Sequence, residues 1–550
     1  MGGTRLATIL VGLGLAGLGV AALSIGLPPA WSQAPAAGAA DADAGAPAVA
    51  TEDSDEAGND DGGVALPPPP ADPDRRDEWL RQQLDAAIKA RPLLTPAAIG
   101  AVVVDATTGK TLWSHHPDRP LNLASVTKVL TSSAALHRLG PGFRWRTSVY
   151  ADKLDPRTRI VEGNLYVRGR GDPTLTLADL ADLTRRLRWQ GIEQVEGDLV
   201  IDGTYFDAAD EPPRFADQPK ERAGYRAPFS AASLERNAVT VQVVADRVGL
   251  GLAKVTVEPN VPDYVKLMSA DVVTVATGRT RIFVSTKVQR THLELRVSGQ
   301  ILADDGVWWQ RRRIDDPARM FGDAFRAALA QGGVKVRGKK QVRAQTPPTA
   351  ILVAEHESAP LAVILRDMNK ASDNFLAESV LKTLGAEALP PPLPGTQQRP
   401  ATWADGLDAV HRYLTDVAGV PPGSFRIENG SGLYDSTAVT ADAVARVLVA
   451  GWRDFRVGPD LTSALAHAGV DGTLRRRLGG DATRGRIRAK TGTLATVTSL
   501  AGYAGVDAGR PLVFVVLINN LPPAARADAR SLQDAVAAAA VAYTDYTAVP

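Results

Sequence analysis

The chain has 550 residues, of which 45% are hydrophobic, 5% aromatic and 22% charged, and this length predicts about two to four domains. It contains no cysteine, which excludes disulfides, a thiol nucleophile, cysteine-bound metal centres and a cysteine-linked lipid anchor. Seven histidines, with only His115 and His116 adjacent, leave little for a metal centre. From Arg75 onward, 61 basic and 51 acidic side chains leave a net charge of +10. That charge could favour an anionic partner, but no dedicated nucleic-acid patch is evident.

The N-terminal stretch has the composition of a targeting segment. Arg5 precedes an apolar run that begins at Leu6 and ends at Leu27, and small residues flank Gln33 as at a signal-peptidase site. The run is longer than the apolar core of a signal peptide, about 7–15 residues, and reaches the roughly 20 residues that span a bilayer. We expect export with cleavage or, as the alternative, an N-terminal anchor. The rest of the chain is then periplasmic or in the cell envelope.

Residues 35–75 contain mainly Ala, Gly, Pro and acidic residues and end in four consecutive prolines. A segment of this composition buries too little apolar surface to offset the entropy cost of ordering, so we expect a disordered acidic tether.

Hydrophobic periodicity predicts the elements of the folded part in chain order. The first are a helix over 77–90, strands over 98–105 and 110–113, and a helix over 124–139. From about 145 to 345, short apolar runs alternate with Gly, Pro and Asp turns, which predicts a β-rich insertion. Helices are expected at 360–384, 403–417 and 441–452, strands at 486–490, 499–504 and 511–518, and an alanine-rich helix after 524.

A Ser-x-x-Lys motif, Ser125 to Lys128, opens one of these helices. The first turn of a helix favours developing negative charge, and a lysine three residues on can fold back onto the serine hydroxyl. A desolvated lysine can then act as a base. Alone, the motif fits a capping serine with a solvated lysine better than a catalytic pair. A second copy, Ser379 to Lys382, lies in mid-helix and is interpreted as an ordinary helix face.

Two further motifs follow in the chain. Ser372-Asp373-Asn374 lies near a predicted helix start, and Lys490-Thr491-Gly492-Thr493 ends a predicted strand. Each alone could be a turn or a strand end. In this order after Ser125 and Lys128, they resemble the motif set of class A β-lactamases and penicillin-binding proteins.

The resemblance extends over about residues 76–545. The chain is similar to low-molecular-mass class C penicillin-binding proteins, the D-alanyl-D-alanine carboxypeptidase/endopeptidase family of the penicillin-binding protein 4 type. The 243 residues between Lys128 and Ser372 match the large β-rich insertion of that family. The family often has Ser and Arg where this chain has Tyr434 and Asp435, which leaves the side-chain preference open. Matching stretches lie at 123–131, 169–173, 197–202, 368–378, 429–433, 470–474 and 488–494.

The resemblance implies an α/β (α+β) fold of the penicillin-recognising serine transpeptidase/β-lactamase type, in which helices flank an antiparallel sheet. We expect a signal peptide or anchor over 1–34, the tether over 35–75, and a transpeptidase-like domain over 76–145 and 350–550. The β-rich insertion would occupy 146–349, with a nested subdomain at about 242–312.

The resemblance also implies roles for the motif residues. Ser125 would be the nucleophile and Lys128 its base, while Ser372 and Lys490 would assist proton transfer to the leaving amine. Asn374 would orient the peptide, and Thr491 and Thr493 would offer hydroxyls to its terminal carboxylate. Gly492 would let the substrate approach the strand edge closely. The backbone N–H groups of Ser125 and Thr493 would stabilise the oxyanion.

On this interpretation the substrate is a peptidoglycan stem peptide, β-lactams inhibit, and neither a metal nor a cofactor is needed. The alternatives are a serine β-lactamase and a non-catalytic scaffold that binds the cell wall. The balance of carboxypeptidase and endopeptidase activity, the oligomeric state and the role of the insertion stay open.

Overall fold

A computed structural model describes residues 66–545 apart from residue 96 and residues 394–396. The predicted targeting segment, with its run from Leu6 to Leu27, and most of the predicted tether lie outside the described residues. All described residues belong to one compact unit. Within this part of the chain, no helix combines the length and apolar character needed to cross a bilayer.

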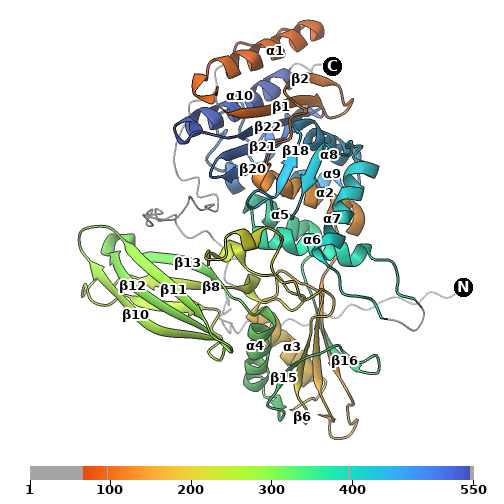
Figure 1. Cartoon of the computed structure of the whole chain (residues 1–550), viewed down its shortest axis with the longest axis vertical. Helices are drawn as coiled ribbons and strands as arrows, with labels where there is room; N and C mark the ends of the chain where they lie inside the picture. The colour runs from red at the N-terminus through yellow and green to blue at the C-terminus, as the bar shows by residue number, and fades with distance from the viewer. Residues whose placement is uncertain (1–65, 96, 394–396, 546–550) are drawn as a thin grey trace, which may run out of the picture. The chain divides into compact units, whose positions relative to one another are not determined.

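A six-stranded antiparallel sheet forms the centre of the part that carries the predicted motifs, in the order β19-β20-β21-β22-β1-β2. Two strands come from the N-terminal side and four from the C-terminal side, so the chain leaves this sheet and returns to it (Figure 1). The strands are β1 (Ala98–Asp105), β2 (Thr111–His115), β19 (Ala466–His467), β20 (Ile487–Leu494), β21 (Val497–Ala504) and β22 (Leu512–Asn519). This confirms the predicted fold class of an antiparallel sheet flanked by helices.

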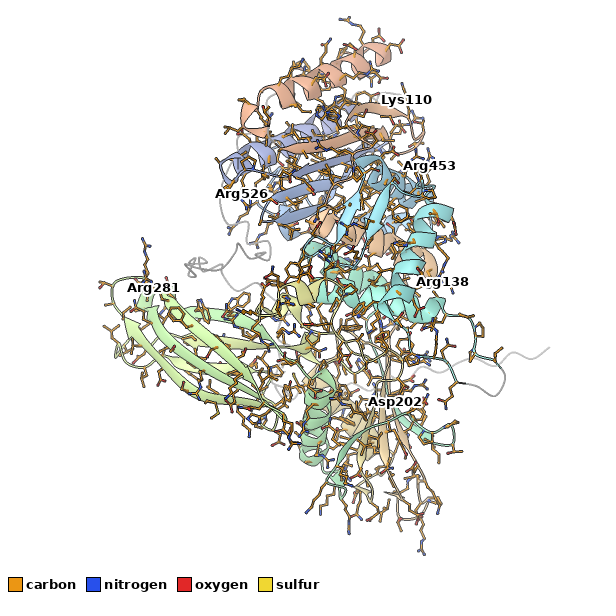
Figure 2. The ribbon with its side chains drawn as sticks, viewed as in Figure 1. Lys110, Arg138, Asp202, Arg281, Arg453 and Arg526 are labelled. Atoms are coloured by element: carbon orange, nitrogen blue, oxygen red, sulfur yellow. The ribbon has the colours of Figure 1, made fainter. Side chains whose placement is uncertain are left out.

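Both faces of the sheet are buried because alternate residues of its central strands, β21, β22 and β1, enter different cores. In β1, Val102 and Val104 pack with helices α2 (Thr127–Leu139) and α8 (Ala441–Arg453), whereas Ile99 and Val103 enter the opposite core. That opposite core is covered by α1 (Pro73–Lys89) and α10 (Arg526–Thr544). Figure 2 labels Lys110, whose ammonium pairs with Asp77 at 2.7 Å and ties α1 to the β1–β2 turn.

The remaining helices of the part that carries the predicted motifs are α5 (Leu361–Lys370), α6 (Asn374–Ala388), α7 (Trp403–Arg412) and α9 (Gly458–Ala464). The helical pattern expected over 360–384 is thus two helices, with Ser372 between them at a left-handed φ of 58°. A π-helical turn, Tyr413–Val417, continues α7, and the short strands β17 (Phe425–Ile427) and β18 (Thr437–Val439) flank the loop before α8.

The chain between α2 and α5 contains four small sheets, ordered β15-β7-β5-β3-β16, β14-β6-β4, β13-β8-β9 and β10-β12-β11. Their longer strands are β3 (Arg146–Ala151), β5 (Leu165–Gly169), β7 (Leu199–Asp202), β8 (Ala238–Val244), β9 (Lys254–Glu258), β10 (Val265–Val275), β11 (Arg281–Val288), β12 (Leu293–Leu302), β13 (Val307–Arg313) and β16 (Ile351–Glu357). The short strands are β4 (Ile160–Val161), β6 (Gln194–Val195), β14 (Lys335–Val336) and β15 (Gln341–Arg343). Asp202, labelled in Figure 2, is buried and accepts a hydrogen bond from the Thr346 backbone after β15.

Two helices in this region, α3 (Leu177–Trp189) and α4 (Pro317–Gln331), were not predicted. Thr176 and Asp179 form a capping box at the start of α3, and its leucines at 180, 183 and 187 face the core. This helical spacing is short and lies between strand-like runs, so the surrounding pattern obscured it.

Candidate active site

The nucleophile candidate Ser125 lies in a 3-10 turn, Ala124–Val126, that leads into α2. The residue before it, Ala124, has a left-handed φ of 47°, and its N–H donates to Asn122 Oδ1 at 2.8 Å. Leu123 N–H donates to the hydroxyl of Thr437 at 3.0 Å. A non-glycine residue in this conformation is strained and persists only where its surroundings hold it. These bonds therefore fix the Ser125 hydroxyl at the positive end of α2.

Lys128 is fully buried and lies one turn after Ser125. Its ammonium contacts three oxygens: Ser125 Oγ at 2.9 Å, Asn374 Oδ1 at 2.7 Å and the Ser431 carbonyl at 3.0 Å. Two of the three predicted motifs thus meet at one nitrogen atom. The contact between Ser125 and Lys128 is the geometry that nucleophile activation requires.

The Ser372-Asp373-Asn374 turn joins α5 to α6. Asp373 is the N-cap of α6, and its side chain accepts the Leu376 N–H at 2.9 Å. Asn374 is the first helical residue, from where its side chain reaches Lys128. The cap and the left-handed Ser372 therefore orient the serine and the asparagine of this motif toward two different lysines.

The second lysine is Lys490 on β20, which is also fully buried. It donates to Ser372 Oγ at 2.9 Å and to the Thr491 carbonyl at 2.8 Å. A Cβ atom at Gly492 would lie 2.6 Å from the Leu123 carbonyl oxygen and 3.0 Å from the Ser125 nitrogen. Glycine is therefore required for β20 to pass this close to the start of α2.

Thr491 and Thr493 differ in their surroundings. The Thr491 hydroxyl is buried and donates to the Thr473 hydroxyl at 2.8 Å. Thr493 is half-buried, and its hydroxyl has no hydrogen-bond partner within residues 66–545 as described. Strand β19 pairs with β20 only at Arg488 and Ala489, so it does not cover the edge of β20 at Thr493. The structure thus brings all eight predicted site residues into one neighbourhood, with Thr493 the better placed of the two threonines to meet a ligand.

Glu378 on α6 supports the site and had no role assigned from the sequence. Its carboxylate is buried and accepts the N–H groups of Gly430 at 3.0 Å and Ser431 at 2.8 Å. Burial raises the pKa of Glu378, against the lowering effect of these hydrogen bonds and of Lys128. Because Glu378 holds the 430–431 backbone, it places the Ser431 carbonyl against Lys128. Its position in the motif-bearing stretch 368–378 was the available signal.

The VDGTL stretch at 470–474 supports β20 in a similar way. Asp471 pairs with Lys370 at 2.5 Å and accepts the His467 N–H at 2.8 Å. Burial raises the pKa of Asp471, but the hydrogen bonds from Lys370 and the His467 N–H, together with the charges of Lys370 and Arg488, lower it below its ordinary value. Through this pair, the last residue of α5 is tied to the loop that carries Thr473.

The second Ser-x-x-Lys motif has a different geometry. Ser379 Oγ donates to the Phe375 carbonyl of its own helix at 2.7 Å. Lys382 is buried and pairs at 2.7 Å with Asp207, in the chain between α2 and α5, and it lies 4.5 Å from the ring centroid of Trp403 on α7. The interpretation of this motif as structural agrees with these contacts.

Tyr434 and Asp435, the two departures from the family pattern, face different surroundings. The Tyr434 hydroxyl donates to Glu221 at 2.7 Å, and the Arg226 guanidinium lies 5.6 Å from its ring centroid. Burial and Glu221 raise the pKa of Tyr434. The side chain of Asp435 is 74% exposed and lies 3.7 Å from Arg426. Of these two residues, Tyr434 thus links its loop to the chain between α2 and α5, as Asn429 also does by donating to the Pro213 carbonyl at 3.2 Å.

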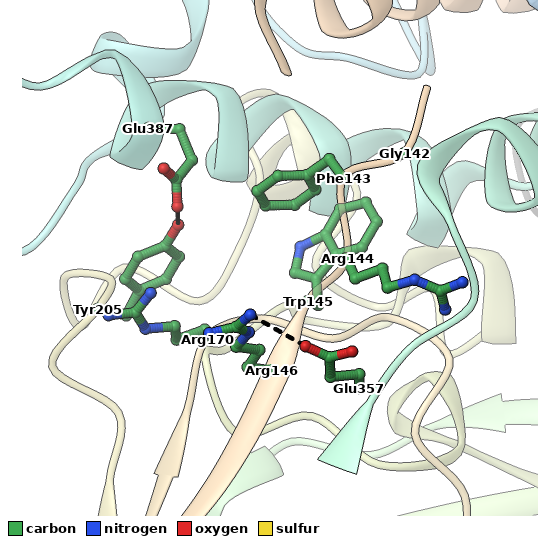
Figure 3. A pocket seen from close by; sticks show the side chains of 9 residues that line it. All are labelled: Gly142, Phe143, Arg144, Trp145, Arg146, Arg170, Tyr205, Glu357 and Glu387. Atoms are coloured by element: carbon green, nitrogen blue, oxygen red, sulfur yellow. Dashed lines mark hydrogen bonds and ion pairs between the residues drawn. The ribbon is translucent and has the colours of Figure 1, made fainter. Parts of the chain in front are cut away.

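A pocket of about 320 Å³ lies elsewhere, between the end of α6, β3 and β16 (Figure 3). Arg146 pairs there with Glu357 at 3.0 Å, and Tyr205 donates to Glu387 at 2.6 Å. It contains none of the predicted site residues. The part of the chain that the structure describes has no cluster of three or more His, Asp or Glu side chains arranged to hold a metal ion.

Comparisons with known proteins extend over most of the chain. The D-Ala-D-Ala carboxypeptidase 3 (S13) family matches residues 80–541. A D-alanyl-D-alanine carboxypeptidase of Actinomadura sp. (strain R39) is 31% identical over 85% of this chain and 86% of the relative. The D-alanyl-D-alanine carboxypeptidase DacB of Haemophilus influenzae is 28% identical over 72% of this chain and 80% of its own length.

Solved structures show a likeness of fold. The crystal structure of penicillin-binding protein 4 from H. influenzae has a TM-score of 0.68 and 23% sequence identity, and it covers 82% of this chain and 97% of that one. The same protein in complex with a β-lactam has a TM-score of 0.64. The similarity thus includes the sheet, its helices and the region between α2 and α5.

Proposed function

Because the chain belongs to the D-Ala-D-Ala carboxypeptidase 3 (S13) family and is a serine D-Ala-D-Ala carboxypeptidase, we propose that it cleaves peptidoglycan stem peptides through an acyl-enzyme on Ser125. The family predicted from the motifs is confirmed by this match over residues 80–541. The observation that carries the proposed mechanism is the contact between the buried Lys128 ammonium and Ser125 Oγ at 2.9 Å.

Acylation begins with proton transfer from Ser125 to Lys128. The neutral amine of Lys128 takes the hydroxyl proton as Ser125 Oγ bonds to the carbonyl carbon of the penultimate D-Ala. Negative charge then develops on the carbonyl oxygen, where the N–H groups of Ser125 and Thr493 stabilise it. Asn374 holds the side chain of Lys128 through the 2.7 Å contact and presents its amide group to the peptide.

Collapse of this intermediate breaks the C–N bond and leaves an ester on Ser125. The leaving nitrogen takes a proton from Ser372 Oγ, and Lys490, at 2.9 Å, supplies a proton to Ser372 in turn. The released product is D-Ala. The proton that Lys128 took from Ser125 then passes to Lys490, which leaves Lys490 protonated and Lys128 neutral again. Water attacks the ester as Lys128 takes a proton from it, and Lys128 returns that proton to Ser125 Oγ as the shortened peptide leaves. We propose that β-lactams acylate the same serine.

Intact-mass spectrometry after exposure to a penicillin tests the nucleophile. The wild-type chain should gain one adduct, and Ser125→Ala should abolish it. Ser379→Ala is the matched control because it has the same spacing to a lysine, and it should keep the adduct. An adduct that survives in Ser125→Ala contradicts the proposal. A wild-type adduct that hydrolyses within seconds would instead favour a β-lactamase, and failure to form any adduct would favour the non-catalytic scaffold.

As a member of a cell-wall enzyme family, the chain is exported, and we propose two finer points about its organisation. Cleavage after Ala34 would release a mature form that begins at Pro35, whereas retention of the run from Leu6 to Leu27 would leave the protein attached to the membrane. N-terminal sequencing of native protein distinguishes these outcomes. The proposed insertion at 146–349 is supported by its own hydrophobic core, whose buried members lie between Val149 and Ala354.

A further inference from the structure

The three consecutive residues just before β8 have left-handed backbone conformations. The φ angles are 51° at Glu235, 55° at Arg236 and 49° at Asn237, and none of the three is glycine. Such strain clusters at functional sites and persists only where the surrounding structure over-determines it. The segment lies in the insertion, outside every motif found in the sequence.

Contacts within the insertion hold this segment from several sides. Asn237 is fully buried, and its side chain donates to the Pro228 carbonyl at 2.9 Å and to Ser233 Oγ at 2.8 Å. Glu235 N–H donates to the Leu175 carbonyl at 2.9 Å, and the Glu235 carboxylate accepts the Leu177 N–H at 2.9 Å. The flanking residues are therefore fixed, and Arg236 between them is presented outward with its side chain 30% exposed.

Arg236 reaches the catalytic motif from this position. Its Nη1 lies 2.6 Å from Oδ2 of Asp373, while Oδ1 of Asp373 accepts the cap bond from Leu376 N–H. Both oxygens of this carboxylate are thus used, one by α6 and one by the insertion. A charged hydrogen bond of this kind is short and directional, so it fixes the orientation of the carboxylate.

Charges on four elements surround Asp373. Burial raises the pKa of its carboxyl, but Arg236, the Leu376 N–H, Arg311 on β13 and Lys128 on α2 lower it below the ordinary value. The carboxyl of Asp367 on α5 acts in the opposite sense to Arg236, because the two carboxylates repel. Arg236 is the largest of the favourable charges on Asp373.

We propose that Arg236 is a positioning residue of the catalytic site: the insertion uses it to fix Asp373 and, through it, the flanking Ser372 and Asn374. This inference deepens the proposed function and rests on it. Ser372 and Asn374 each contact one catalytic lysine, at 2.9 and 2.7 Å, so a shift of the turn would disturb both proton paths together. Through Arg236, the insertion thereby becomes part of the catalytic apparatus.

The test compares the second-order rate constant for acylation by a penicillin among variants. Arg236→Met should lower it by about 10- to 100-fold, the scale of a misplacement near 1 Å. Arg236→Lys, which keeps the charge, should recover part of the loss. Asp373→Asn keeps the cap but removes the ion pair. After Asp373→Asn, the further change Arg236→Met should therefore add little. Arg319→Met is the matched control, since its pair with Asp323 has similar exposure but lies within α4, and it should change the rate by less than about two-fold.

The pH profile separates positioning from a loss of stability. Without Arg236 the pKa of Asp373 should rise, because burial remains while the main opposite charge is gone. Arg236→Met should therefore show an added loss of acylation toward acidic pH that is absent when Asp373→Asn is also present. If the wild-type chain acylates normally and Arg236→Met leaves both the acylation rate constant and its pH profile unchanged, the positioning role is overturned but the proposed function stands. A wild-type chain that neither acylates nor releases D-Ala overturns both this role and the proposed function.

Discussion

Asn374 Oδ1 lies 2.7 Å from the buried ammonium nitrogen of Lys128, and Ser125 Oγ lies 2.9 Å from the same nitrogen. The amide oxygen orients the lysine without adding charge. A neutral acceptor matters here because the proposed base must be able to give up its proton before it can take one from Ser125.

We therefore expect Asn374→Asp to lower the rate of acylation by more than its small change in shape implies. A carboxylate at this place favours the protonated lysine, which cannot act as a base. Acylation near neutral pH should fall by about 10²- to 10⁴-fold, the scale of one general base. Stopped-flow acylation with a chromogenic β-lactam measures this, and part of the loss should be regained as pH rises. A pH-independent loss would show that the amide group acts on the substrate rather than on Lys128.

The ion pair between Lys382 and Asp207 should serve stability and not catalysis. Burial lowers the pKa of Lys382, against the raising effect of Asp207. Asp207→Ala leaves this ammonium buried with a weaker set of partners, and we expect a loss of about 1–3 kcal/mol in the free energy of unfolding. In this variant the unfolded state binds the proton of Lys382 more tightly than the native state does. The loss of unfolding free energy should therefore shrink as pH rises toward 10.

Chemical unfolding measures this loss, and the double variant Asp207→Ala, Lys382→Met should recover part of it by removing the unpaired charge. Acylation of Ser125 should stay unchanged in the folded Asp207→Ala protein. A specific loss of acylation would place Lys382 in the catalytic apparatus.

The two Ser-x-x-Lys motifs show how far sequence reasoning reaches. Their spacing is the same, and only the helix start distinguishes Ser125 from Ser379, which instead bonds to its own helix at 2.7 Å. Local pattern therefore predicted the helix that bears Ser125 and Lys128 and pointed to the two residues as a pair. It could not predict that Asn374, 246 residues away, completes the environment of Lys128, because only tertiary packing joins them. The order of the motifs supplied that link through the family resemblance.

Arg236 was beyond sequence reasoning for a related reason. A run of three left-handed residues with no glycine has no local sequence signature, because it is imposed by contacts to Leu175, Pro228 and Ser233. The capping box at Thr176, in contrast, was a local signal for α3 that the strand-like surroundings outweighed.

Asp210 should make stability depend on pH in the mildly acidic range. Burial raises the pKa of Asp210 to about 6, and Lys382 only partly offsets this. The native state then binds the proton of the Asp210 carboxyl more tightly than the unfolded state does. The contribution of Asp210 to stability therefore falls as pH rises from about 4 to about 6. Asp210→Asn should raise the free energy of unfolding at pH 7.5 by about 1–3 kcal/mol, the scale of a shift near two pH units.

Thermal unfolding at pH 7.5 and 4.5 checks this, with the exposed Asp118→Asn as control. The gain from Asp210→Asn should nearly vanish at pH 4.5, where the native carboxyl is already protonated. An equal gain at both pH values would show that shape or hydrogen bonding, and not charge, determines the effect.

The Thr493 hydroxyl should bind the terminal carboxylate of the substrate, whereas Lys490 should assist the reaction whether or not the substrate has a free carboxylate. The Thr493 hydroxyl has no partner within the described residues, and an unpaired buried carboxylate on a ligand is costly. Thr493→Val deletes this hydroxyl but keeps the backbone N–H proposed for the oxyanion. We expect a loss of about 1–3 kcal/mol in transition-state binding for peptides with a free C-terminal carboxylate. An amidated peptide should lose much less.

Lys490→Ala should impair both peptides, because it removes the cation 2.9 Å from Ser372 and so interrupts proton delivery to the leaving amine. The values of kcat/KM for a D-Ala-D-Ala peptide and for its C-terminal amide measure the two effects side by side. Thr491→Val is the internal comparison. Because the Thr491 hydroxyl donates to the Thr473 hydroxyl at 2.8 Å, its loss should affect the two peptides more nearly equally than the loss of the Thr493 hydroxyl does. Equal losses on both peptides for Thr493→Val would show that this hydroxyl does not contact the carboxylate, and the substrate would then lie along β20 in a different orientation.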